Sequence, residues 1–173
     1  MKKSLDALFF ALSMENQGEA FFRSSAARVK NSITKTMFQN LADWEVEHQQ
    51  YIQAQLDSLQ GAGKWDAAAA IPSEAAQIGP QTFRARGVDL PKEQSLPVEE
   101  KTTELSALRM ALFIEEDLYK FYKQAAAHTD DPEGKKVFAT LSAWESDHRD
   151  ILDSRYQVLK EAFFAELGFN PGY

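Results

Sequence analysis

The chain has 173 residues, of which 44% are hydrophobic and 26% are charged, a composition typical of a globular protein with a sizeable core. Its net charge of −7 argues against a general affinity for nucleic acid or anionic membranes, and no stretch approaches the length of a membrane span. The absence of cysteine excludes disulfides, thiolate metal sites and thiol nucleophiles, and it leaves the compartment undecided. We expect a single domain over residues 1–173.

An internal repeat organises the sequence. When residues 5–52 are aligned with 105–152 without gaps, 15 of the 48 positions are identical, including the words WEVEH at 44–48 and WESDH at 144–148. The first residues, MKKSLDALFFALS, resemble a secretion signal, but they have a repeat partner in mid-chain. We therefore interpret them as part of a helix and expect a cytoplasmic protein.

The first half of the repeat predicts two helices. Apolar residues recur every three or four positions from Leu5 to Val29, which is one face of a helix, and Ser4 is a suitable N-cap. A second helix is expected from Asn31 to about Leu59, where glycines at 61 and 63 end it. These two helices form a predicted antiparallel hairpin over about 4–60.

A long connection is expected over 61–102, because this segment holds four of the six prolines and four of the eight glycines. The third helix is predicted to follow Thr103. The fourth should start with Asp131 as N-cap and Pro132 at its first position, which gives a second hairpin over about 103–167. Two hairpins joined by one long crossover predict an all-α fold, a ferritin-like four-helix bundle.

Acidic residues and histidines interrupt the apolar stripes at equivalent positions of the two halves. An ionised carboxylate in a core costs several kcal/mol unless it is paired or bound to metal, so such a group of carboxylates needs cations. The candidate metal ligands are Glu15, Glu45, His48, Glu115, Glu145 and His148.

The spacing of these residues indicates how they would act together. A glutamate and a histidine three positions apart lie on one face of a helix, so each Glu-x-x-His pair can reach one centre. One glutamate from each of two helices, with Glu-x-x-His from the other two, is the ligand pattern of di-iron and di-manganese carboxylate bundles. A single Glu-x-x-His is usually a solvated surface feature, but the duplicated set favours a metal site. The remaining alternative is a duplicated bundle that keeps its ligands and has lost its chemistry.

Several neighbouring side chains are secondary candidates. Tyr122 follows Glu115 by two turns and is placed either to hydrogen-bond a ligand carboxylate or to donate an electron, whereas its repeat equivalent is a phenylalanine. Glu19 also falls on the inner stripe, as an extra ligand or as a residue that turns out to solvent. Trp44 and Trp144 precede the motif glutamates, and we expect them to pack in the core next to the site rather than to relay electrons.

The sequence resembles the rubrerythrin branch of the ferritin-like superfamily. The resemblance is carried by SMENQGEAFF with MFQNLADWEVEHQQYI, and by FIEEDLYKFY with VFATLSAWESDHRDIL. It implies a four-helix bundle that holds a non-haem di-iron centre. Members of that family reduce peroxide, or react with oxygen while they oxidise ferrous iron.

The sequence departs from the rubrerythrin pattern in two ways. Rubrerythrins proper carry a cysteine-ligated iron domain that supplies electrons, and this chain lacks the rubredoxin-type domain because it has no cysteine. The family also has a further glutamate one turn after the third-helix ligand, where this chain has Leu118, so a seventh carboxylate is missing unless Glu116 or Glu19 replaces it. This departure weakens the assignment as a peroxidase.

The leading functional hypothesis is a di-iron peroxidase or oxidase. Two iron ions, for which manganese or zinc is an alternative, would be bridged by Glu45 and Glu145 and capped by one histidine each. An external electron donor such as a rubredoxin-like protein is the expected partner, nucleic acid and membrane are not, and a homodimer is a further expectation. Two other hypotheses are an iron-binding or ferroxidase protein without a separate substrate and a structural bundle stabilised by its metals.

Overall fold

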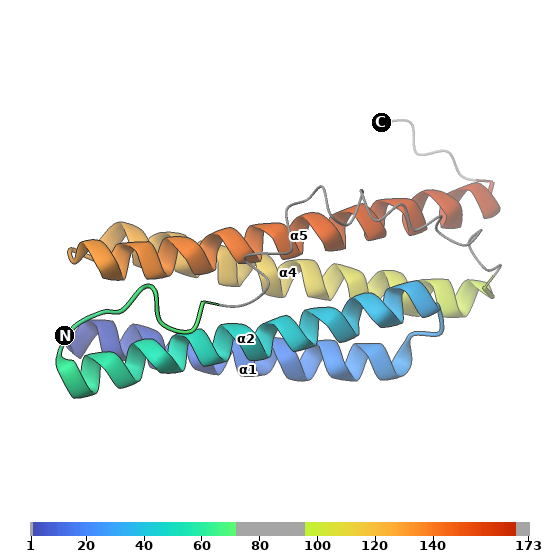
Figure 1. The fold of residues 1–173 in the computed structure, drawn as a ribbon. Coiled ribbons are helices and arrows are strands. Elements are labelled where there is room, and N and C mark those ends of the chain that lie inside the picture. Colours follow the sequence, from blue (N-terminus) through green and yellow to red (C-terminus); the bar gives the residue numbers. More distant parts are fainter. Residues whose placement is uncertain (1, 72–95, 169–173) are drawn as a thin grey trace.

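The computed structural model describes residues 2–71 and 96–168, and within them the chain forms four helices and no strand. These helices are α1 (Lys2–Arg28), α2 (Ser32–Ala62), α4 (Val98–His128) and α5 (Pro132–Glu166). Figure 1 shows that α1 and α2 form one antiparallel hairpin and that α4 and α5 form a second hairpin alongside it. The all-α, ferritin-like four-helix bundle predicted from the repeat is confirmed.

The ends of two helices follow the local signals in the sequence. The Asn31 side chain accepts hydrogen bonds from the backbone N–H groups of Ile33 and Thr34 at 2.9 and 3.3 Å, which satisfies two donors at the start of α2. Gly63 adopts the left-handed conformation that ends α2, with φ of 68°. Asp131 caps α5 in the same way as Asn31 caps α2. These three predicted helix boundaries are confirmed.

The starts of the other two helices differ from the prediction. Ser4 is not an N-cap, because α1 already includes Lys2. The third helix of the bundle, α4, begins at Val98 and not after Thr103, whose hydroxyl donates to the Glu99 carbonyl inside the helix. Pro97 precedes this helix, and acidic residues in the first turn favour its positive end. The connection between the hairpins is therefore shorter than predicted, and its residues 72–95 lie outside the described part of the chain.

The apolar core consists of two clusters at opposite ends of the bundle. In α1, for example, Leu8 and Ala11 belong to one cluster and Phe22 and Ala26 to the other, and Glu15 lies between them. The same order holds on the other three helices. The six candidate ligands therefore occupy the middle of the bundle, with a layer of apolar residues on either side.

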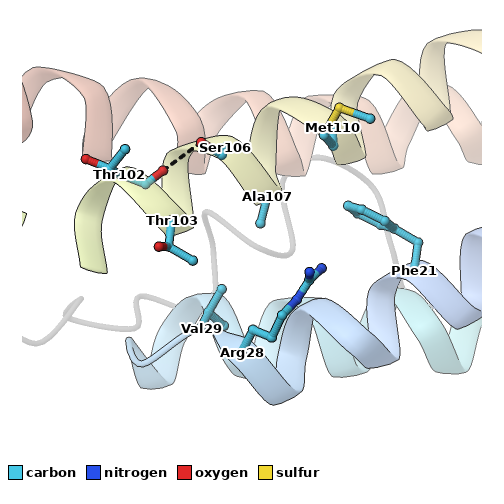
Figure 2. Close-up of a pocket in the computed structure, with 8 residues that line it drawn as sticks. All are labelled: Phe21, Arg28, Val29, Thr102, Thr103, Ser106, Ala107 and Met110. Atoms are coloured by element: carbon cyan, nitrogen blue, oxygen red, sulfur yellow. Dashed lines mark hydrogen bonds between the residues drawn. The ribbon is translucent and has the colours of Figure 1, made fainter. Parts of the chain in front are cut away.

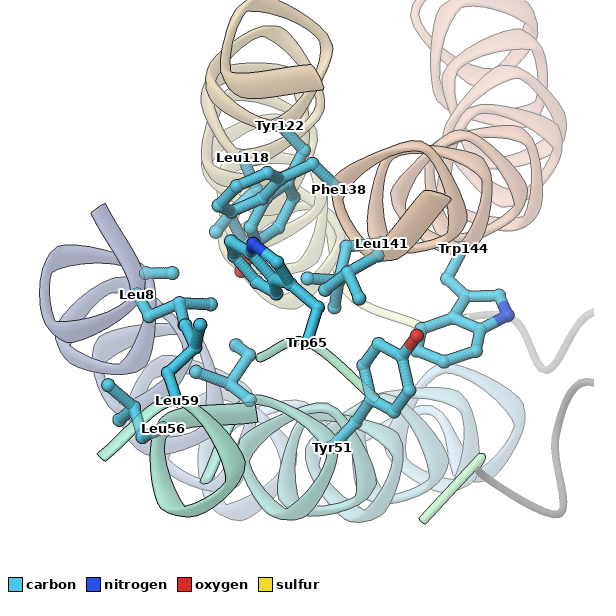
Figure 3. Packing of buried hydrophobic residues seen from close by; sticks show 13 residues of the cluster. Leu8, Tyr51, Leu56, Leu59, Trp65, Leu118, Tyr122, Phe138, Leu141 and Trp144 are labelled. Atoms are coloured by element: carbon cyan, nitrogen blue, oxygen red, sulfur yellow. The ribbon is translucent and has the colours of Figure 1, made fainter. Parts of the chain in front are cut away.

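Repeat symmetry breaks down at the two ends of the bundle. Thr34 and Gly134 are equivalent positions. The Thr34 hydroxyl donates to buried Glu104 and accepts a hydrogen bond of 2.7 Å from Arg155, which also donates to Glu104 at 3.0 Å. At the other end Gly134 lies directly against the indole of Trp65, which comes from the connecting segment and packs into the core (Figure 3).

The Gly134–Trp65 contact gives a specific prediction. A Cβ atom on residue 134 would lie 2.5 Å from the indole, so Gly134→Ala should displace Trp65 and destabilise the protein by about 1–3 kcal/mol. Gly61→Ala is the matched control, because a Cβ there meets no atom within 4 Å among the described residues and alanine favours a helix. Urea unfolding followed by circular dichroism measures both variants. Equal stability of Gly134→Ala and wild type would contradict the packing of Trp65 described here.

Candidate metal centre

Six buried side chains from all four helices meet in the middle of the bundle. α1 and α4 contribute one glutamate each, and α2 and α5 contribute one Glu-x-x-His pair each. One potential ligand atom from each residue of the two pairs lies within 4.8 Å of the others. Each of the six side chains has a relative exposure of 0%, and they are Glu15, Glu45, His48, Glu115, Glu145 and His148. The structure thus brings together every residue of the predicted ligand set.

The His48 ring faces three carboxylates through its Nδ1 atom. Nδ1 lies 3.1 Å from Glu145 Oε1, 3.5 Å from Glu15 Oε2 and 3.6 Å from Glu45 Oε2. The ring is therefore oriented with one nitrogen towards the carboxylates of its own hairpin and of the other hairpin.

The His148 ring makes the equivalent set of contacts. Its Nδ1 atom lies 3.4 Å from Glu145 Oε2, 3.5 Å from Glu115 Oε1 and 3.7 Å from Glu45 Oε1. The two motif glutamates, Glu45 and Glu145, thus direct one oxygen to each histidine. In contrast, the outer glutamate of each half is paired with the histidine of its own half.

Crowding of these charges shifts their pKa values in different directions. Burial and then the negative charge of Glu15 raise the pKa of Glu45 well above its usual range, and burial with the charge of Glu145 does the same for the pKa of Glu115. Burial opposes ionisation of Glu145 as well, but the adjacent His48 and His148 rings outweigh it, and the pKa of Glu145 lies below its usual range.

The pKa of the His48 ring is shifted in the direction that favours its positive charge. Burial disfavours its charged form, but the neighbouring Glu145 carboxylate outweighs burial and raises the pKa of His48 well above its usual value. Protons on the carboxyls and a positive imidazole therefore balance the cluster when no metal is bound. A divalent cation would displace those protons and take over their role.

The carboxylate oxygens of the cluster fit a metal ion. No hydrogen bond of normal geometry from the described residues reaches either oxygen of Glu45, Glu115 or Glu145, although all these oxygens are buried. Leaving buried carboxylate oxygens in this state is costly, and coordination to a cation would remove the cost. Imidazole and carboxylate donors together suit iron, manganese and zinc. This donor set is compatible with a di-iron site.

Tyr122 contacts the cluster directly. Its hydroxyl donates a hydrogen bond to Glu15 Oε1, and burial followed by the charge of Glu15 raises the pKa of the Tyr122 phenol well above its usual value. The phenol therefore stays protonated and fixes the orientation of that carboxylate. Phe22 occupies the equivalent position in the other half, so Glu115 has no matching phenol.

The structure does not bring Glu19 into the cluster. Its carboxylate pairs with Arg23 at 2.7 Å and accepts a hydrogen bond from Gln49 at 3.0 Å, and these two contacts lower the pKa of Glu19. Glu116 is likewise held near the surface, by Arg149 at 2.7 Å. Leu118 is fully buried in the apolar core. None of these three positions supplies a seventh carboxylate to the centre.

The two motif tryptophans pack next to the site, as predicted. Trp44 and Trp144 stack on the imidazole rings of the centre, and both belong to or pack against the apolar clusters. Sequence reasoning overlooked Glu104 and Arg155, which form the buried pair at one end of the bundle. Glu104 precedes Leu108 by four residues and therefore lies on the same buried face of the helix. This spacing could have identified Glu104 as a buried residue.

A surface pocket lies between α1 and α4, and none of the six candidate ligands lines it (Figure 2). Its volume is about 410 Å³, and Phe21, Val29 and Met110 supply apolar walls next to Arg28 and Thr103. Its lining contains no carboxylate and no histidine. The buried centre, and not this pocket, therefore offers the groups that bind metal.

The fold is that of the ferritin-like bundles, and the buried carboxylate and histidine cluster is compatible with a di-iron site. The family model for rubrerythrin matches residues 6–156, and the chain belongs to the rubrerythrin family. A hypothetical protein from Pyrococcus furiosus has the same fold, with a TM-score of 0.65 and 21% sequence identity, over 91% of this chain and 90% of that chain. A search of curated proteins found no match. Among the described helices, none combines the length and the apolar character needed to cross a membrane.

Proposed function

We propose that this protein is a non-haem di-iron oxidoreductase that reduces hydrogen peroxide or dioxygen, in oxidative-stress or iron metabolism. The observation that carries the proposal is the orientation of Glu45 and Glu145, each of which directs one oxygen to each histidine. This orientation supports a bridging role for both glutamates between two ions. Glu15 and Glu115 would then be terminal ligands, one on each ion.

Each residue of the centre has a defined part in this proposal. His48 and His148, whose Nδ1 atoms face the carboxylates, would hold one ion each, and Tyr122 holds Glu15 in place through its hydroxyl. The apolar layers above and below exclude water, which strengthens the electrostatic interactions at the centre. When bound, two ferrous ions supply the two electrons that, with two protons, convert one peroxide into two water molecules.

A separate electron donor completes the proposed cycle. This chain contains no cysteine and therefore no thiolate-bound iron of its own. We propose that a rubredoxin-like protein or another one-electron carrier returns the electrons to the oxidised centre.

Leu118 favours a second candidate function, the oxidation of ferrous iron without a separate substrate. An apolar residue fills the position from which the family's extra carboxylate would act, and the six candidate ligands make equivalent contacts in the two halves. Turnover with a reductant separates this function from the first one.

Anaerobic stopped-flow absorbance of the iron-loaded protein tests the proposal. Mixing the ferrous protein with stoichiometric peroxide or with oxygen should oxidise the iron rapidly and completely. Repeated consumption of peroxide with an added reductant would support the oxidoreductase, and a single oxidation without turnover would support the ferroxidase alternative. Bound iron that reacts with neither oxidant would contradict both functions and leave the metal with a structural role.

A further inference from the structure

The two tryptophans and the two histidines form one column of stacked rings. Trp44 stacks on His148 with a centroid distance of 5.3 Å and an interplanar angle of 19°. The two imidazoles stack on each other at 5.1 Å and 10°, and His48 stacks on Trp144 at 5.0 Å and 15°. The column crosses between α2 and α5, so each tryptophan packs on the histidine of the other hairpin.

Such a column fixes the plane of each imidazole. The torsion that turns a histidine ring about its Cβ–Cγ bond has broad minima, so an isolated ring turns readily. Here one face of each ring is covered by an indole and the other face by the second imidazole, and turning either ring would break both stacks. In this arrangement the Nδ1 atoms lie 3.1–3.7 Å from the carboxylate oxygens.

We propose that Trp44 and Trp144 are positioning residues for metal binding, each acting across the hairpins on the other motif's histidine. This inference rests on the proposed metal centre. The two tryptophans contact the histidine ligands and do not bind the metal themselves. Part of the metal affinity would nevertheless depend on them. Residues that hold a metal ligand in its orientation without binding the metal commonly contribute about 10–100-fold to metal affinity.

The two ends of the column are supported differently. Trp144 is 6% exposed and packs edge to face with Tyr51 at a ring-centroid distance of 5.2 Å, and the Tyr51 hydroxyl donates to the Ala67 carbonyl at 3.1 Å. Figure 3 shows Tyr51 next to Trp144. The repeat equivalent of Tyr51 is Ile151, and Trp44 is only partly buried. The Trp144 end is therefore the more rigid one, and loss of Trp144 should have the larger effect.

Cobalt(II) titration of single variants tests the proposal. Affinity is measured by competition with a chelating dye on the whole protein after removal of bound metal. We expect Trp144→Leu to weaken cobalt binding about 10–100-fold and Trp44→Leu to weaken it less. Trp65→Phe is the matched control, because this third tryptophan packs on Phe138 and not on the ring column, and its affinity should equal that of wild type.

Two further measurements separate positioning from general stability. Phenylalanine at either position keeps an aromatic face on the imidazole, so Trp144→Phe should recover most of the affinity lost in Trp144→Leu. Fluorescence gives a readout independent of activity. Cobalt should quench the emission of a Trp65→Phe variant, which retains both column indoles, far more than that of a Trp44→Phe/Trp144→Phe variant, which retains only Trp65.

The outcomes distinguish this proposal from the proposed function. If wild type binds cobalt and both leucine variants bind it equally well, the positioning role is overturned and the metal centre stands. If wild type binds no cobalt, the proposed centre and the positioning role fail together. Where Trp144→Leu does not fold, Trp144→Met replaces it, because methionine fills the space with a flexible side chain that has no ring. It should weaken cobalt binding about 10–100-fold, and unchanged affinity would overturn the role.

Discussion

Replacing Glu145 with glutamine should destabilise the metal-free protein by about 3 kcal/mol, whereas Glu45→Gln should cost less than about 1.5 kcal/mol. The pKa of Glu145 is depressed because it lies between two histidines, so an amide there leaves the His48 charge buried without its nearest carboxylate, 3.1 Å away. Burial and the charge of Glu15 raise the pKa of Glu45 well above its usual range, which favours the protonated, neutral carboxyl. A neutral amide closely replaces that neutral acid.

Both substitutions should nevertheless abolish binding of two metal ions, because each removes a proposed bridging carboxylate. Urea unfolding in the presence of a chelator gives the stabilities, and iron or cobalt titration gives the metal stoichiometry. Glu19→Gln is the control for both measurements, since Glu19 lies outside the cluster and pairs with Arg23. Full metal binding by Glu45→Gln and Glu145→Gln would show that the ligand assignment is wrong.

The metal-free protein should become less stable as the pH rises from about 5 to about 9, while added metal should stabilise it more strongly over the same range. The folded-state pKa values of Glu45, Glu115 and His48 are raised, so the folded protein holds protons that the unfolded chain releases above about 4.5 for the glutamates and about 6.5 for the histidine. The stability they contribute is present below those values and is lost as the pH rises through the folded-state pKa values.

Glu145 acts in the opposite sense, and only in the acid range. Its folded-state pKa is lowered, so the stability it contributes is present above about 4.5 and is lost as the pH falls towards the folded-state value. Each proton held by the folded protein alone changes the unfolding free energy by about 1.4 kcal/mol per pH unit. The net expectation for the metal-free protein is a maximum in the weakly acidic range.

Urea unfolding at several pH values, with chelator and with cobalt, measures this dependence. The Glu45→Gln variant is an internal check, since it has no proton to release at that position and should lose stability less steeply with pH. Cobalt affinity should rise with pH because the metal competes with protons for the same ligands. A metal-free protein that becomes more stable between neutral and alkaline pH would contradict the protonation states described above.

The absence of a seventh carboxylate limits what the centre is expected to do. Glu19 and Glu116 are each held by an arginine near the surface, and Leu118 contributes only to the core. The six-residue cluster resembles the family's centre without the additional glutamate, and this difference is the reason to test iron oxidation together with peroxide reduction.

Local sequence patterns were sufficient to predict the four helices and the composition of the cluster. The apolar stripes, the start of α2 at Asn31 and its end at Gly63 depend on residues within a few positions of one another, and the structure agrees with these predictions. The start of α4 was not, because Pro97 and the acidic turn after it were interpreted as part of the connection. The predictions therefore agree best with the structure where a feature depends on neighbouring residues of one helix.

The repeat of the two hairpins and the place of the six carboxylate and imidazole residues on the inner faces follow from the amino-acid sequence, because the helical period sets which side chains share one face of a helix. Packing of the helices against one another was needed to place Glu45 and Glu145 against the histidine of the other hairpin, Glu19 against Gln49, and each tryptophan on the histidine of the other hairpin. These contacts join residues tens of positions apart. They depend on how the hairpins pack and on which charges that packing removes from water.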